Sequence, residues 1–103
     1  MTITGQILTR ARELIADPKH WGQAIVAANA EGHEVPVLEA TCFCAAGAIC
    51  RAERELEAST NRFAAYLALG FQTGYVLGQW NDAPTTTHAD VLAAFDQAIA
   101  KCN

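Results

Sequence analysis

The amino-acid sequence predicts an all-α domain, a compact bundle of four to five helices with a short β-hairpin or an irregular loop near residues 22–38. Alanine supplies much of the 51% hydrophobic content, and alanine is the residue that a helix accommodates best. Apolar residues also recur at helical spacing in the first and last segments of the chain. A chain of 103 residues has the size of one domain, so we expect residues 1–103 to form a single helical unit.

The first helix is predicted to start with Thr4 as its N-cap and to run to about Asp17. Pro18 should end this helix, because the residue before a proline avoids helical geometry. Its apolar face consists of Ile7, Leu8, Ala11, Leu14 and Ile15. The stretch 30–33, Ala-Glu-Gly-His, is typical of a turn and predicts the hairpin or loop that follows.

Three helical segments are predicted in the middle of the chain. Thr41 is expected to cap a helix that runs to about Ala58, whose second half carries charged residues at spacings that favour i,i+4 ion pairs. Residues 59–61 then restart the chain into an apolar helical segment that Gly70 should end. A further short helix is predicted over residues 75–80, from the apolar run 75–77 and Trp80.

The last helix has the clearest local signals in the sequence. Thr87 and Asp90 form a T-x-x-D capping box, in which each side chain bonds the backbone N–H of the other residue. His88 then occupies the first helical position. One apolar face consists of Val91, Leu92, Phe95, Ala98, Ile99 and Cys102, which predicts an amphipathic helix packed on the core.

Composition argues against several classes of function. The net charge of −4 and the pI near 5.2 disfavour a nucleic-acid partner, because an acidic surface repels phosphate. The longest apolar run, 43–50, is too short to span a bilayer, and the N-terminus lacks a signal-peptide pattern, so we expect a cytoplasmic protein without a membrane partner. Three of the four cysteines follow C-x-C-x5-C, which matches no zinc pattern, and we expect no metal and no cofactor.

Cys44 is the cysteine with the strongest case for reactivity. With Thr41 as the N-cap, Cys44 lies in the first turn of the helix, where the N–H groups and the helix dipole favour a thiolate. It also shares the least apolar stripe of that helix, which predicts the most accessible thiol. The alternative is a packing cysteine beside Gly47, where the missing side chain lets another element approach closely.

Asp82 and His88 could complete a catalytic set with Cys44. An aspartate in a turn usually accepts from the N–H two residues later, but Pro84 has none. Asp82 must therefore bond another donor, either the hydroxyls of residues 85–87 or His88, which it would then orient. The helix dipole disfavours a charged imidazole at His88, so that a neutral base is expected there.

Three short motifs resemble those of an uncharacterised family of small bacterial and phage-encoded proteins. They are P-x-H-W at residues 18–21, [WF]-C-x-x-G-A at residues 43–48, and W-N-D-x-P at residues 80–84 followed by T-H-x-x-V at residues 87–91. The resemblance implies a shared set of motif residues and no activity. This set consists of Trp21, Cys44, Trp80, Asn81, Asp82 and His88.

Two functions from different classes, and a structural role, fit these observations. The first is a non-enzymatic protein-binding or adaptor module that uses a surface near residues 80–82, with Trp21, Trp80, Asn81 and His20 as binding residues. The second is a cysteine-dependent hydrolase or transferase with Cys44 as nucleophile, His88 as base and Asp82 or Asn81 as the orienting group. The third is an oligomer-forming protein in which the motif residues only build the core.

Overall fold

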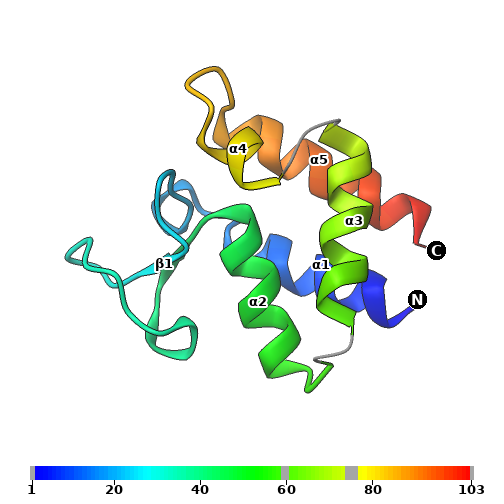
Figure 1. Cartoon of the computed structure of the whole chain (residues 1–103), viewed down its shortest axis with the longest axis horizontal. Helices are drawn as coiled ribbons and strands as arrows, with labels where there is room; N and C mark the ends of the chain where they lie inside the picture. Colours follow the sequence, from blue (N-terminus) through cyan, green and yellow to red (C-terminus); the bar gives the residue numbers. More distant parts are fainter. Residues whose placement is uncertain (1, 59–60, 74–76, 103) are drawn as a thin grey trace.

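The prediction of a helical bundle with a small β excursion is confirmed by a computed structural model, which describes residues 2–58, 61–73 and 77–102 (Figure 1). The helices are α1 (Ile3–Leu14), α2 (Ala45–Glu55), α3 (Arg62–Thr73), α4 (Leu77–Asp82) and α5 (His88–Lys101). Helix α1 packs against α2, α3 and α5, and α4 bridges α2 and α3. The excursion between α1 and α2 extends to the left of this bundle in Figure 1.

The core lies where the helices meet and combines a few large side chains with many alanines. The fully buried large residues include Ile7, Leu8, Ile49, Phe95 and Phe43. Alanines at 11, 48, 52, 65 and 98 are each at most 1% exposed. Because an alanine adds only a methyl group, the helices can pack closely, so alanine here both favours helix and builds the interface.

Two helices start at caps other than the predicted ones. The N-cap of α1 is Thr2, whose hydroxyl accepts from the Gly5 N–H at 3.0 Å, so the prediction of Thr4 was wrong by two residues. The helix ends at Leu14 rather than near residue 17, because Asp17 is extended and caps the short 3-10 helix η1 (Pro18–His20). Helix α2 starts at Ala45, since residues 42–43 form a strand.

The remaining helix boundaries differ from the predictions in smaller ways. Helix α2 ends at Glu55, three residues before the predicted Ala58. Helix α3 continues through Gly70 to Thr73, and Gly70 lacks the positive φ that a glycine ending a helix usually adopts. The predicted restart at residues 59–60 and the start of the fourth helix at 75–76 lie outside the described residues. The capping box of α5 is confirmed on both sides, with Thr87 and Asp90 as its members.

The β excursion pairs segments on both sides of a turn. Strand β1 (Ala27–Ala28) runs antiparallel to β2 (Cys42–Phe43), and a single bridge joins Ala28 to Glu34 across the turn. The turn is ordered by Asn29, whose side-chain oxygen accepts from the N–H groups of residues 31 and 33. Gly32 adopts the positive φ of 84° that the turn requires. A second 3-10 helix, η2 (Val37–Glu39), leads back to β2.

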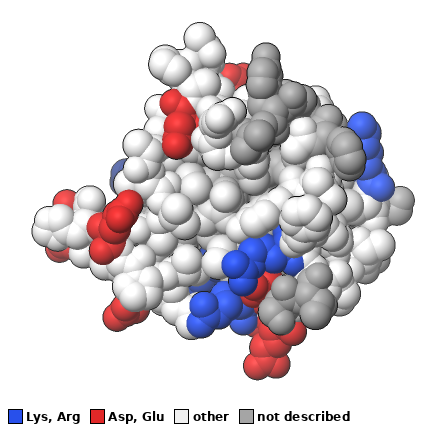
Figure 2. Space-filling view, in the orientation of Figure 1, with Lys and Arg blue, Asp and Glu red and all other residues white. Residues whose placement is uncertain are grey.

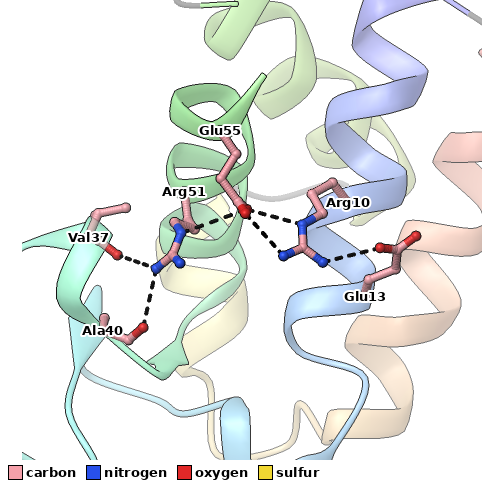
Figure 3. Close-up of polar contacts among 6 residues, drawn as sticks. All are labelled: Arg10, Glu13, Val37, Ala40, Arg51 and Glu55. Atoms are coloured by element: carbon pink, nitrogen blue, oxygen red, sulfur yellow. Dashed lines mark hydrogen bonds and ion pairs between the residues drawn. The ribbon is translucent and has the colours of Figure 1, made fainter. Parts of the chain in front are cut away.

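An ion-pair network ties this excursion to the bundle (Figure 3). Arg10 of α1 forms two hydrogen bonds with Glu55 of α2, at 3.1 and 3.0 Å, and these bonds lower the pKa of the Glu55 carboxyl. Arg51 pairs with Glu55 at 3.7 Å, the i,i+4 spacing expected for this helix. Arg51 also donates to the carbonyls of Val37 and Ala40. The network therefore fixes η2 against α2.

Candidate functional site

Asn81, at the end of α4, lies at the centre of a polar network that joins three parts of the chain. Its side chain is fully buried. The amide oxygen accepts from the Trp21 indole N–H at 2.8 Å and from the Ala45 N–H at 3.0 Å. The amide nitrogen donates to the Gly22 carbonyl at 3.1 Å and to Asp82 at 2.9 Å. An Asn side chain offers two donors and two acceptor sites, so all of its hydrogen-bonding capacity is used inside the protein.

Asp82 bonds neither the threonine hydroxyls nor His88, so both predicted roles were wrong. Its Oδ1 accepts from the Ala24 N–H at 2.9 Å as well as from Asn81. Ala24 has a φ of 61°, in the left-handed region that residues with a side chain seldom adopt. The carboxylate therefore holds the segment 21–24 in a strained conformation. Pro84 offers Asp82 no N–H, and the Ala24 N–H, 58 residues before Asp82, takes its place.

Gln23 completes the contact between the two segments, a role that its sequence neighbours do not indicate. Its side-chain NH2 donates to the carbonyls of Asn81, Ala83 and Thr86, at 3.0, 2.9 and 3.3 Å. We call the segment 21–24, held by residues 81–86, the anchored loop. No local sequence pattern predicts this role for Gln23, because its hydrogen-bond partners lie in a distant part of the sequence.

His88 is the first residue of α5, as predicted, and it faces the anchored loop. Its Nε2 lies 2.6 Å from the Ile15 carbonyl oxygen, which makes that nitrogen the donor. The imidazole lies against the Trp21 indole with 5.7 Å between ring centroids. His88 thus joins the end of α1 to the loop, and a neutral imidazole that donates from Nε2 keeps Nδ1 as its acceptor nitrogen.

Cys44 is the N-cap of α2 and not a residue of its first turn. Its Sγ accepts from the Gly47 N–H at 3.3 Å, and the residue is 6% exposed. The prediction of the most accessible thiol was therefore wrong, because the other three cysteines are only partly buried. Burial raises the pKa of the Cys44 thiol, and the nearby negative charge of Asp82 adds to this effect.

We expect Cys44 to resist alkylation in the folded protein. A neutral, buried thiol is a poor nucleophile, so a small alkylating reagent at neutral pH should label the partly exposed Cys42, Cys50 and Cys102 first. Peptide mapping after a short reaction, with and without urea, measures each site. Labelling of Cys44 at least as fast as that of Cys102 would contradict the buried environment described here.

The anchored loop also forms part of an open cleft. The cleft has a volume of about 560 Å³ and is lined by residues from segments 19–25, 28–32 and 41–42. His20, predicted as a binding residue, lines it. Trp80 instead lines a second cleft of about 400 Å³ beside the start of α5. The predicted binding residues are therefore divided: Trp21 and Asn81 hold the loop, while His20 and Trp80 border two different clefts.

Within residues 2–58, 61–73 and 77–102, no three His, Cys, Asp or Glu side chains gather as they would around a metal ion. Nor does any helix in these ranges have the length and apolar character needed to cross a membrane. Among the motif residues, Trp21, Asn81 and Asp82 belong to one hydrogen-bonded network around the buried Asn81 side chain, and the open clefts lie at its border.

Comparison with known proteins gives one match. Comparisons with curated proteins and with solved structures found no match. A model of a family of unknown function, DUF6197, matches residues 1–101 and so spans the helices, the anchored loop and both clefts. The chain therefore belongs to this family of unknown function, DUF6197.

Proposed function

We propose that this protein is a non-enzymatic protein-binding module whose partner contacts the exposed face of α3. The observation that carries the proposal is a pair of large apolar side chains one helical turn apart. Phe63 is 70% exposed and Leu67 is 45% exposed. Residues at i and i+4 are neighbours on a helix surface, so these two side chains form one apolar patch. Exposed Ala64 extends it. We call these three residues the α3 patch.

The α3 patch carries no free charge. Helix α3 has a single charged residue, Arg62, and its guanidinium donates to Glu53 of α2 at 2.9 and 2.6 Å. Glu53 is 1% exposed, so the Arg62–Glu53 pair neutralises a buried carboxylate and Arg62 is not an unpaired charge beside the α3 patch. In Figure 2 the surface visible over the middle of α3 is white, and basic and acidic side chains lie near its lower end.

The chemistry of this surface indicates the kind of partner. Exposed aromatic side chains are common at the centre of protein interfaces, where their burial supplies most of the binding free energy. A helix face with a Phe and a Leu one turn apart fits an apolar groove or the apolar face of another helix. We therefore propose that the partner of the α3 patch is an uncharged, apolar surface on another protein.

The residues near Asn81 are less suited to this role than the sequence suggested. The Asn81 amide and the Trp21 indole N–H are bonded within the fold, so these groups cannot recognise a partner. The cysteine-dependent enzyme has weaker support still, since Cys44 is buried with a raised pKa and the Nε2 of His88 is bonded to a backbone carbonyl.

A paired set of variants tests the proposal. A photo-reactive residue in place of Ala64 should cross-link a second protein in cells that produce this protein naturally, whereas one in place of exposed Ala93 on α5 should not. The captured protein, once purified, should bind the wild-type chain directly. The double variant Phe63→Ser, Leu67→Ser should lose at least about 30-fold in affinity, the effect of losing one aromatic hot spot.

The control is Leu38→Ser, which changes an apolar residue in η2 whose exposed fraction of 51% lies between those of Leu67 and Phe63. It should retain wild-type affinity. Both variants should unfold within about 0.5 kcal/mol of wild type, because exposed side chains contribute little to stability. Equal loss of binding in both variants contradicts the assignment. So does a wild-type dimer that the double variant converts to monomers, which would show that the α3 patch joins two copies of this chain.

A further inference from the structure

The cleft beside the anchored loop has an electrostatic character opposite to that of the whole protein. The chain carries 11 acidic and 7 basic residues and a net charge of −4. Among the residues that line the cleft, Lys19 is charged and none is an Asp or a Glu. No ion pair of Lys19 occurs within the described residues. Burial raises the pKa of the Cys42 thiol, so Cys42 adds no negative charge to the cleft.

Neutral hydrogen-bond donors supplement the lysine. The side-chain oxygen of Asn29 accepts from two N–H groups of the turn, which fixes the orientation of the amide and leaves its NH2 group without a partner in the described part of the chain. The Thr41 hydroxyl also has no partner there, and its residue is exposed. The His20 imidazole lines the same cleft and can donate from one ring nitrogen. Lys19, Asn29, Thr41 and His20 can therefore each donate a hydrogen bond into the cleft.

Gly22 keeps the cleft open. A Cβ at this position would lie 3.1 Å from the Ile25 Cδ1 and 3.3 Å from the Cys42 Sγ, closer than ordinary contacts. Gly22 does not have the positive φ that often explains a glycine, so space and not backbone conformation accounts for the residue. Two hydrogen bonds fix the Gly22 backbone. The Gly22 N–H donates to the Phe43 carbonyl, and the Asn81 side-chain NH2 donates to the Gly22 carbonyl.

These observations describe a cleft whose Gly22 backbone and Asn29 amide are held by hydrogen bonds. The cleft volume of about 560 Å³ lies within the range of small-molecule sites, which combine apolar walls with a few placed polar groups. Ile25 and the exposed Ala30 supply apolar surface, and Lys19, Asn29 and Thr41 supply donors. One cation, without an arginine, suits an anion with a single charge better than a phosphate, which usually draws arginines or a helix N-terminus.

We propose that this cleft binds a carboxylate carried on a short apolar group. The carboxylate would bond Lys19, Asn29 and Thr41, and the apolar part would lie against Ile25 and Ala30. Such a group occurs in small organic acids and at the C-terminus of a peptide that ends in an aliphatic residue. The site is independent of the α3 patch, so either proposal can fail without the other.

Chemical-shift mapping on the full, ¹⁵N-labelled chain tests the proposal. The probes are 4-methylpentanoate, its uncharged amide of the same shape, and inorganic phosphate. The carboxylate should shift the amide signals of segments 19–32 and 41–42, with a Kd on the order of 1 mM for so small a ligand. The amide should bind about tenfold more weakly, which is the effect of losing one charge-assisted hydrogen bond.

Two variants locate the binding. Lys19→Met should lower the affinity for the carboxylate about tenfold and leave that for the amide unchanged, while Lys101→Met on α5 should change neither. Lys19 is exposed, so this variant should fold normally. Gly22→Ala should weaken both probes by filling the cleft.

Four results would overturn the proposal. These are equal affinity for the acid and the amide, shifts confined to other segments, phosphate binding as tight as that of the acid, and no saturable shift with any probe. Peptides ending in leucine, with a free or an amidated C-terminus, then distinguish the two sources of the carboxylate, a small organic acid and a peptide C-terminus. Preference for the free C-terminus assigns the site to peptides, and failure of both peptides assigns it to small acids.

Discussion

Replacing Gly47 with alanine will destabilise the protein by about 3 kcal/mol, at the upper end of what overpacking a core usually costs. A Cβ at Gly47 would lie 1.8 Å from the carbonyl oxygen of Val26, a backbone atom that cannot rotate away. That carbonyl also accepts from the Cys44 N–H at 3.3 Å. Any shift that relieves the clash therefore disturbs the start of α2. Urea unfolding followed by circular dichroism measures the loss.

The chain contains a matched control for this substitution. Gly78 lies in α4, and a Cβ there would meet nothing within 4 Å. Gly78→Ala should raise stability by about 0.5–1 kcal/mol, because alanine favours helix and restricts the unfolded chain. The two variants carry the same chemical change, so their opposite signs isolate the contact with Val26. A Gly47→Ala protein as stable as wild type would contradict the close approach of the two segments.

Asn81→Ala should cost about 3–5 kcal/mol, since it removes a buried side chain and leaves several of its partners unbonded. The Trp21 indole N–H and the Ala45 N–H lose their acceptor, and the Gly22 carbonyl loses its donor. The loss should appear in urea unfolding together with a change in tryptophan fluorescence, because Trp21 is released from its contact.

Gln97→Ala is the control for the Asn81 substitution. Gln97 is an exposed residue on α5, so its amide can be removed at a cost within about 0.5 kcal/mol. A loss below about 1 kcal/mol in Asn81→Ala would mean that water replaces the amide without difficulty. In that case the network around Asn81 would not be what holds the anchored loop.

The parts of the fold that local sequence determines were predictable. The capping box of α5 involves residues three positions apart, and both of its bonds are present. The apolar face of α1 follows from helical spacing alone, and four of its five predicted residues are fully buried. In both cases the physical signal and the structure it produces lie within a few turns of the chain, where sequence patterns can be read directly.

The candidate sites depended on contacts between distant segments, which no local pattern contains. Residues 42–43 pair with residues 27–28 as a strand, so α2 begins only at Ala45 and Cys44 is its N-cap. Asp82 was correctly judged to need an unusual donor, but that donor is the Ala24 N–H. The cleft combines three segments, and only His20 among its lining residues had been predicted to bind.

The anchored loop also has a consequence for the order in which the chain acquires its structure during synthesis. Its bonding partners in segment 81–86 lie 58 to 63 residues further along the sequence. The ribosome makes residues 21–24 early, while a closure of this length must wait until residues 81–86 exist and have left the ribosome. Helices α1 and α2 can pack before that point, but Ala24 has no carboxylate to hold its strained conformation. The cleft beside the loop is therefore a late product of biosynthesis, completed only when nearly the whole domain has been translated.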